Sequence, residues 1–194
     1  MKKGCALLMI LLVSPLAMAA KVDPKTVGIL PFNDEGEVEY QAVVEVAGAD
    51  ASTLYSNALV AIADLYKSSP DVTQVADEKA GRIIVEGWVE LKSPESGFMQ
   101  FADATSGSVT SWRLHHQITI EVRDGRWRYT VNDLVVDHAW SGNSVSGPSN
   151  FTVPLGEYKR GRKFLSRLHT YVDDDIKSTI HELTQLMAET PDEW

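Results

Sequence analysis

The dipeptide Asp124-Gly125 constrains the fold of this chain more than any other local feature. A two-residue turn of this type needs positive φ at both positions, which Asp and Gly tolerate well, so the flanking runs are expected to form a β-hairpin. Counting outward predicts an apolar face with the pairs Val122–Trp127, Ile120–Tyr129, Ile118–Val131, His116–Asp133 and Leu114–Val135. The other face is largely polar and pairs Arg123–Arg126, Glu121–Arg128, Thr119–Thr130, Gln117–Asn132 and His115–Leu134. One face of the hairpin therefore packs, and the other meets water or a partner.

Hydrophobic periodicity predicts the remaining elements. Apolar residues alternate over 37–46 and 82–91, which is the period of a half-buried strand, and a short strand is expected at 72–75. Spacings of three and four predict helices over 51–67 and 162–189. We therefore expect a single α+β domain over 37–190, with long loops at 92–111 and 139–161. The second loop is rich in Gly, Ser, Asn and Pro over 141–150, which is typical of a mobile segment. Residues 20–36 form an extended lead-in with a possible short edge strand at 27–32.

The first nineteen residues have the pattern of a cleavable secretory signal peptide. Lys2 and Lys3 precede an apolar run over 6–13, and the small-residue motif Ala17-Met18-Ala19 follows Pro15. This run is too short to span a bilayer, which needs about 20 apolar residues. We expect a mature protein that begins near residue 20, is periplasmic or secreted, and has no membrane anchor.

Cysteine and charge narrow the possible functions of the mature protein. Cys5 is the only cysteine and leaves with the signal peptide, so lipid attachment, disulfides and thiolate chemistry are not expected. Removing Lys2 and Lys3 leaves sixteen of the eighteen basic residues against twenty-seven acidic ones, a formal charge of −11. This balance opposes binding to phosphate backbones, which needs uncompensated Lys and Arg. Nucleic acid is therefore not an expected partner.

Several short motifs resemble a family of exported bacterial proteins of unknown function that have a TATA-binding-protein-like fold. They are Asp23-Pro24-Lys25, Gly28 with Pro31, Gly36 ahead of Val38, Leu54-Tyr55, Ala80-Gly81-Arg82-Ile83 and the run 119–129. The resemblance implies the order strand, helix, four strands, helix, with both helices on one face of an antiparallel sheet and the other face open. The segment 92–111 is longer than the family's pattern. The resemblance implies no activity, and DNA binding does not follow from the fold alone.

The adjacent histidines His115 and His116 are the obvious catalytic candidates. They point to opposite faces of a strand and so cannot chelate one metal together. In the expected register, Asp133 lies opposite His116, where a carboxylate could orient the imidazole and raise its pKa. This pair supports an alternative hypothesis of a small hydrolase or ligand carrier, although a satisfied cross-strand hydrogen bond is the favoured explanation. We expect no catalytic residue, no metal site and no cofactor.

The open sheet face is where a specific surface is expected. Its outward residues include a tryptophan and two arginines, which are common in interfaces; the set is Ile84, Trp88, Arg113, His115, Gln117 and Arg128. The leading hypothesis is a non-enzymatic exported module that binds a protein, peptide or glycan across this face. Alternatively, Phe98, Met99 and Phe101 of the long loop fold back and cover Trp88 as a second core.

Overall fold

The computed structural model describes residues 21–66, 72–95, 97, 100–101, 105, 109–141 and 149–188. The elements follow in the order η1 (Pro24–Val27), β1 (Tyr40–Glu45), α1 (Ala51–Leu65), β2 (Thr73–Asp77), β3 (Arg82–Glu90), β4 (Val109–Arg123), β5 (Arg126–Ser141), β6 (Ser149–Pro154), η2 (Leu155–Glu157) and α3 (Arg162–Ala188). The predicted signal peptide and most of the 141–150 segment lie outside the described residues.

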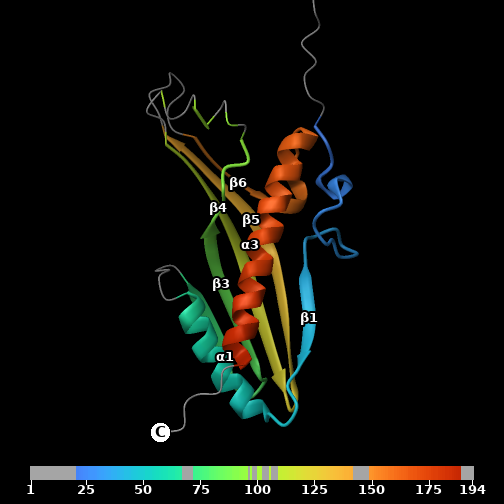
Figure 1. The fold of residues 1–194 in the computed structure, drawn as a ribbon, viewed down its shortest axis with the longest axis vertical. Helices are drawn as coiled ribbons and strands as arrows, with labels where there is room; N and C mark the ends of the chain where they lie inside the picture. The colour runs from blue at the N-terminus through green and yellow to red at the C-terminus, as the bar shows by residue number, and fades with distance from the viewer. Residues whose placement is uncertain are drawn as a thin grey trace, which may run out of the picture.

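The strands form one antiparallel sheet in the order β1-β5-β4-β3-β2, and β6 pairs with β5 farther along that strand than β1 does. Figure 1 shows α3 lying lengthwise over the sheet, with α1 near its C-terminal end. Both helices cover the same face: Tyr40 on the buried side of β1 donates a hydrogen bond to Asp173 of α3, and Tyr66, just after α1, reaches His116 of β4. The predicted α+β class, with one covered and one open face, is confirmed.

The hairpin turn also fixes the start of α1. Asp124 accepts a hydrogen bond from the backbone N–H of Ala51, and Asp50 accepts one from the N–H of Thr53, so two N–H groups at the helix start have carboxylate partners. The strand register beside the turn is the predicted one, from Arg123–Arg126 as far as Gln117–Asn132. The predicted turn geometry is wrong, because of the two turn residues only Gly125 has a positive φ, of 76°.

Beyond Gln117 the register shifts by one residue, so the predicted pairing there is wrong. The next pair is His115 with Val135, which leaves an extra residue on β5 and makes a β-bulge. Asp133 takes a positive φ of 52° and is exposed, while Leu134 occupies the buried position opposite His116. The predicted pairs that this shift overturns are His116–Asp133, Leu114–Val135 and His115–Leu134.

Three other predictions need correction. The 139–161 segment is not wholly irregular, because β5 runs to Ser141 and β6 adds a sixth strand through 149–154. The 92–111 segment is shorter than expected, since β4 begins at Val109. Residues 27–32 form no strand: the lead-in contains η1 and the single bridges Val22–Arg160 and Phe32–Val38.

A glycine lets the end of α1 approach the sheet closely. A Cβ built on Gly87 would lie 2.7 Å from Cε1 of Tyr66, so only a residue without a side chain leaves room for that ring. The Tyr66 hydroxyl in turn lies 2.7 Å from Nε2 of His116, the cross-strand neighbour of Gly87. Gly87 therefore positions a buried hydrogen bond as well as a helix.

Replacing Gly87 with Ala is expected to displace the Tyr66 ring and lower the free energy of unfolding by roughly 1–3 kcal/mol, the cost of overpacking a core. Urea denaturation followed by circular dichroism measures this. Gly97→Ala is the matched control, because a Cβ there meets nothing within 4 Å. Equal stability of the Gly87→Ala variant and the wild type would contradict this packing.

Candidate functional site

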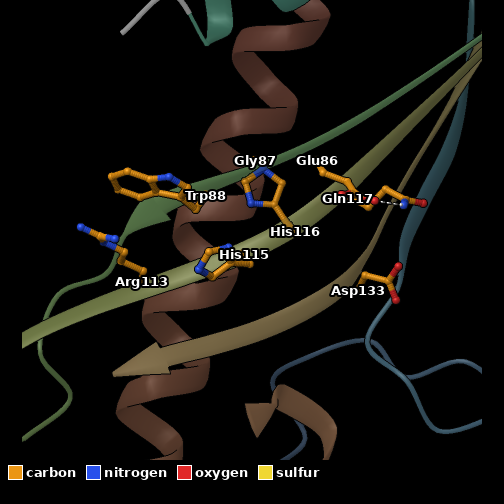
Figure 2. A pocket seen from close by; sticks show the side chains of 8 residues that line it. All are labelled: Glu86, Gly87, Trp88, Arg113, His115, His116, Gln117 and Asp133. Carbon is orange, nitrogen blue, oxygen red and sulfur yellow. Dashed lines mark hydrogen bonds between the residues drawn. The ribbon is translucent and has the colours of Figure 1, made fainter. Parts of the chain in front are cut away.

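A hollow of about 340 Å³ opens on the uncovered face of the sheet, over β3 and β4 (Figure 2). Its lining residues are Glu86, Gly87, Trp88, Arg113, His115, His116, Gln117 and Asp133. Strand alternation sends the side chains of Trp88, Arg113, His115 and Gln117 to this face, and those four are half-buried. The structure thus brings together four of the six predicted binding residues.

Trp88 and Arg113 lie together at one end of the hollow (Figure 2). The Arg113 guanidinium carbon lies 4.4 Å from the centroid of the Trp88 ring, a cation–π contact. Nε of Arg113 is buried and has no hydrogen-bond partner among the described residues. On the other side, Gln117 donates a hydrogen bond of 3.3 Å to Glu86. The site therefore combines one aromatic ring, a positively charged hydrogen-bond donor, a negatively charged acceptor and a neutral amide.

Sequence reasoning did not include Glu86 and Asp133 in the binding set. Glu86 lies two residues before Trp88 in β3, so strand alternation places its side chain on the same open face. Asp133 reaches the hollow only because the β-bulge turns it out of the buried face. The adjacent Asn132 and Asp133 are a sequence signal for a bulge inside the strand, because Asn and Asp adopt positive φ more readily than most residues.

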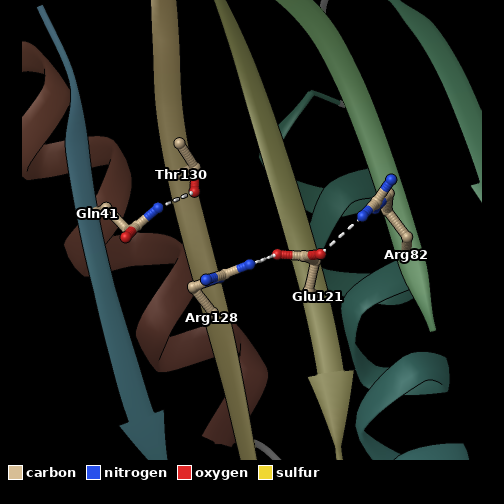
Figure 3. A network of polar contacts seen from close by, with 5 residues as sticks. All are labelled: Gln41, Arg82, Glu121, Arg128 and Thr130. Carbon is tan, nitrogen blue, oxygen red and sulfur yellow. Dashed lines mark hydrogen bonds and ion pairs between the residues drawn. The ribbon is translucent and has the colours of Figure 1, made fainter. Parts of the chain in front are cut away.

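The other two predicted binding residues lie elsewhere on the face. Ile84 is half-buried farther along β3, opposite Thr119. Arg128 lines a separate hollow of about 240 Å³ near the hairpin turn. Figure 3 shows it bonded to Glu121, which also accepts a hydrogen bond of 2.9 Å from Arg82. These bonds hold the pKa of Glu121 below its usual value.

His116 and Asp133 do not form the predicted pair. His116 is 2% exposed and its Nε2 is bonded to the Tyr66 hydroxyl on the helix side, whereas Asp133 is exposed on the bulge. Burial lowers the pKa of His116 to about 4, the opposite of the rise that a carboxylate partner would cause. The two side chains are therefore not arranged as the carboxylate–imidazole pair on which the alternative hypothesis of a hydrolase or ligand carrier was based.

The described part of the 92–111 loop does not support a second core over Trp88. Phe101 is 66% exposed. Phe98 and Met99 lie outside the described residues. Within the described ranges, no group of three or more His, Cys, Asp or Glu side chains is placed to hold a metal ion, and no helix is long and apolar enough to cross a membrane.

A family model described as a domain of unknown function (DUF4468) with TBP-like fold matches residues 40–137. A crystal structure of a TBP-like protein from Parabacteroides distasonis aligns with a TM-score of 0.62 and 11% identity over 84% of this chain and 99% of that one. A DUF4468 family protein from Bacteroides ovatus aligns with a TM-score of 0.58 and 15% identity, covering 87% and 95%. No curated protein matches. At these identities the structural likeness shows the fold alone.

The buried histidines predict that the fold is sensitive to acid. His169 of α3 is 0% exposed, and burial lowers its pKa, like that of His116, to about 4. Unfolded histidine has a pKa of about 6.5, so stability is complete above that pH and is lost as the pH falls toward 4. From pH 7 to pH 5 the expected loss is roughly 2 kcal/mol for each histidine.

Urea midpoints measured at pH 7 and pH 5 test this. His169→Leu should reduce the difference between the two midpoints, and the exposed His181→Gln should leave it unchanged. If wild type and His169→Leu lose the same stability between the two pH values, His169 is not the group that titrates.

Proposed function

We propose that this chain, which belongs to the DUF4468 family of domains with a TBP-like fold, is an exported, non-enzymatic binding module. It holds a segment of a protein, peptide or glycan in the hollow over β3 and β4. The predicted signal peptide supports export. A hollow of about 340 Å³ suits a short segment of ligand rather than a whole protein surface.

The observation that carries this proposal is the Trp88–Arg113 stack on the uncovered face. Tryptophan and arginine are the side chains most enriched among residues that dominate binding energy. Here they lie in contact and half-buried at one end of the hollow on that face, while the opposite face is covered by α1 and α3. The packing of the sheet against the helices does not require a tryptophan and an arginine in contact on its solvent-exposed face.

The charges in the hollow favour a neutral, polar ligand. Arg113 lies on one side, and Glu86 and Asp133 also line the hollow, so an anionic or a cationic group meets a like charge. A saccharide unit avoids this repulsion. Its hydroxyls can donate to Glu86 and bond with Gln117, and its C–H face can pack on the Trp88 indole. Of the three partner classes, a glycan fits these groups best.

The surroundings of His116 support a binding role over catalysis. A hydrolytic base needs an accessible ring nitrogen and a group that orients it. Nε2 of His116 is hydrogen-bonded to the Tyr66 hydroxyl on the helix side, so it is not free to act as a base. Among its described lining residues, the hollow has no serine, threonine or cysteine that could act as a nucleophile.

Glycan-array binding with purified variants tests the proposal. Trp88→Ala is expected to weaken binding at least about tenfold, as for a residue at the centre of an interface. Arg113→Lys keeps the charge but loses the planar stack, so an intermediate loss is expected. Arg160→Lys is the matched control, since Arg160 stacks on Phe164 outside the sheet. A folded Trp88→Ala variant that binds the same glycan as tightly as wild type refutes the proposed site. Binding only to peptides would refute the glycan assignment.

A further inference from the structure

Arginines gather at the hairpin end of the open face, away from the Trp88 hollow. Arg123, Arg126 and Arg128 line the second hollow together with Val43, Glu121 and Trp127. Arg123 and Arg126 flank the two-residue turn and are direct cross-strand partners, and all three arginines are exposed. Like charges directly opposite on neighbouring strands destabilise a sheet. This pairing is notable in a chain whose formal charge is −9.

Among the residues that the structure describes, no carboxylate forms an ion pair with Arg123 or Arg126. Glu121 is already bonded to Arg82 and Arg128. Asp124 accepts from the N–H of Ala51 at the start of α1. Glu45 lies opposite Arg126 in the β1–β5 register.

Among the described residues, however, neither Arg123 nor Arg126 makes an ion pair within 4 Å or a side-chain hydrogen bond. Two guanidinium groups with ten N–H donors therefore face solvent side by side.

We propose that Arg123 and Arg126, with Arg128 beside them, bind the phosphate group of a phosphate monoester. A phosphate monoester carries about two negative charges at neutral pH, which matches the two unpaired guanidinium groups, and its oxygens accept the paired donors of each arginine fork. A carboxylate carries one charge and satisfies only one fork. Val43 lines the same hollow, is 54% exposed and offers an apolar surface to the group that bears the phosphate. This site does not depend on the function proposed for the Trp88 hollow.

Binding of inorganic phosphate and pyrophosphate, followed by NMR of the arginine Nε–H groups at constant ionic strength, tests the site. Both anions are expected to shift the Arg123 and Arg126 signals, whereas acetate and chloride shift them far less. Arg123→Gln/Arg126→Gln should weaken pyrophosphate binding at least about tenfold, since two charge-assisted contacts are lost. Lys21→Gln/Lys163→Gln removes the same charge from exposed positions outside the sheet and should bind as wild type does.

Vesicles of phosphatidylcholine, with and without phosphatidic acid, distinguish the two sources of a phosphate monoester. Arginine-dependent binding to the phosphatidic acid vesicles assigns a lipid headgroup, and binding to the free anions alone assigns a soluble phosphoester. Each single variant, Arg123→Gln or Arg126→Gln, relieves the like-charge contact and is expected to be at least as stable as wild type. The proposal is overturned if wild type binds neither phosphate nor pyrophosphate at millimolar concentration, if acetate binds equally well, or if the double variant binds unchanged.

Discussion

The pairing of β4 with β5 is the interaction on which the rest of this structure depends. β3 attaches to β4, while β1 and β6 attach in succession to β5. The turn residue Asp124 joins the hairpin to the start of α1. Residues on one side of the ladder, such as Ile118, Ile120 and Trp127, are buried, and the alternate residues make the open face. A single local feature, the Asp124-Gly125 turn, therefore sets both the core and the surface that we propose binds a ligand.

The sequence predicted the fold well near that turn and less well far from it. Alternation assigned Trp88, Arg113, His115 and Gln117 to one face, and the structure places them around one hollow. Alternation does not locate residues along a long ladder, so Ile84 and Arg128 were grouped with them although they lie farther along the strands. The bulge at Asp133 was missed because counting from a turn assumes an unbroken ladder, and β6 was missed because its short run follows a segment rich in turn residues.

The two ends of the open face differ in chemistry. Around Trp88, acids, an amide and one arginine surround an aromatic ring, which favours a neutral ligand. At the hairpin end, three arginines and one glutamate line the hollow, which favours an anion. Between them, pairs such as Gln41–Thr130 satisfy each other (Figure 3). We therefore propose that the side chains on the open face, and not the TBP-like fold itself, determine which ligand binds.

We propose that ligand binds at Trp88 on the open face. The most direct test is NMR of the indole N–H groups while the protein is titrated with a glycan that binds it on the array. Trp112 and Trp127 are buried and serve as internal references. The Trp88 signal is expected to shift with saturation while those of Trp112 and Trp127 stay in place. A titration that shifts Trp112 or Trp127 and leaves Trp88 unchanged would contradict it.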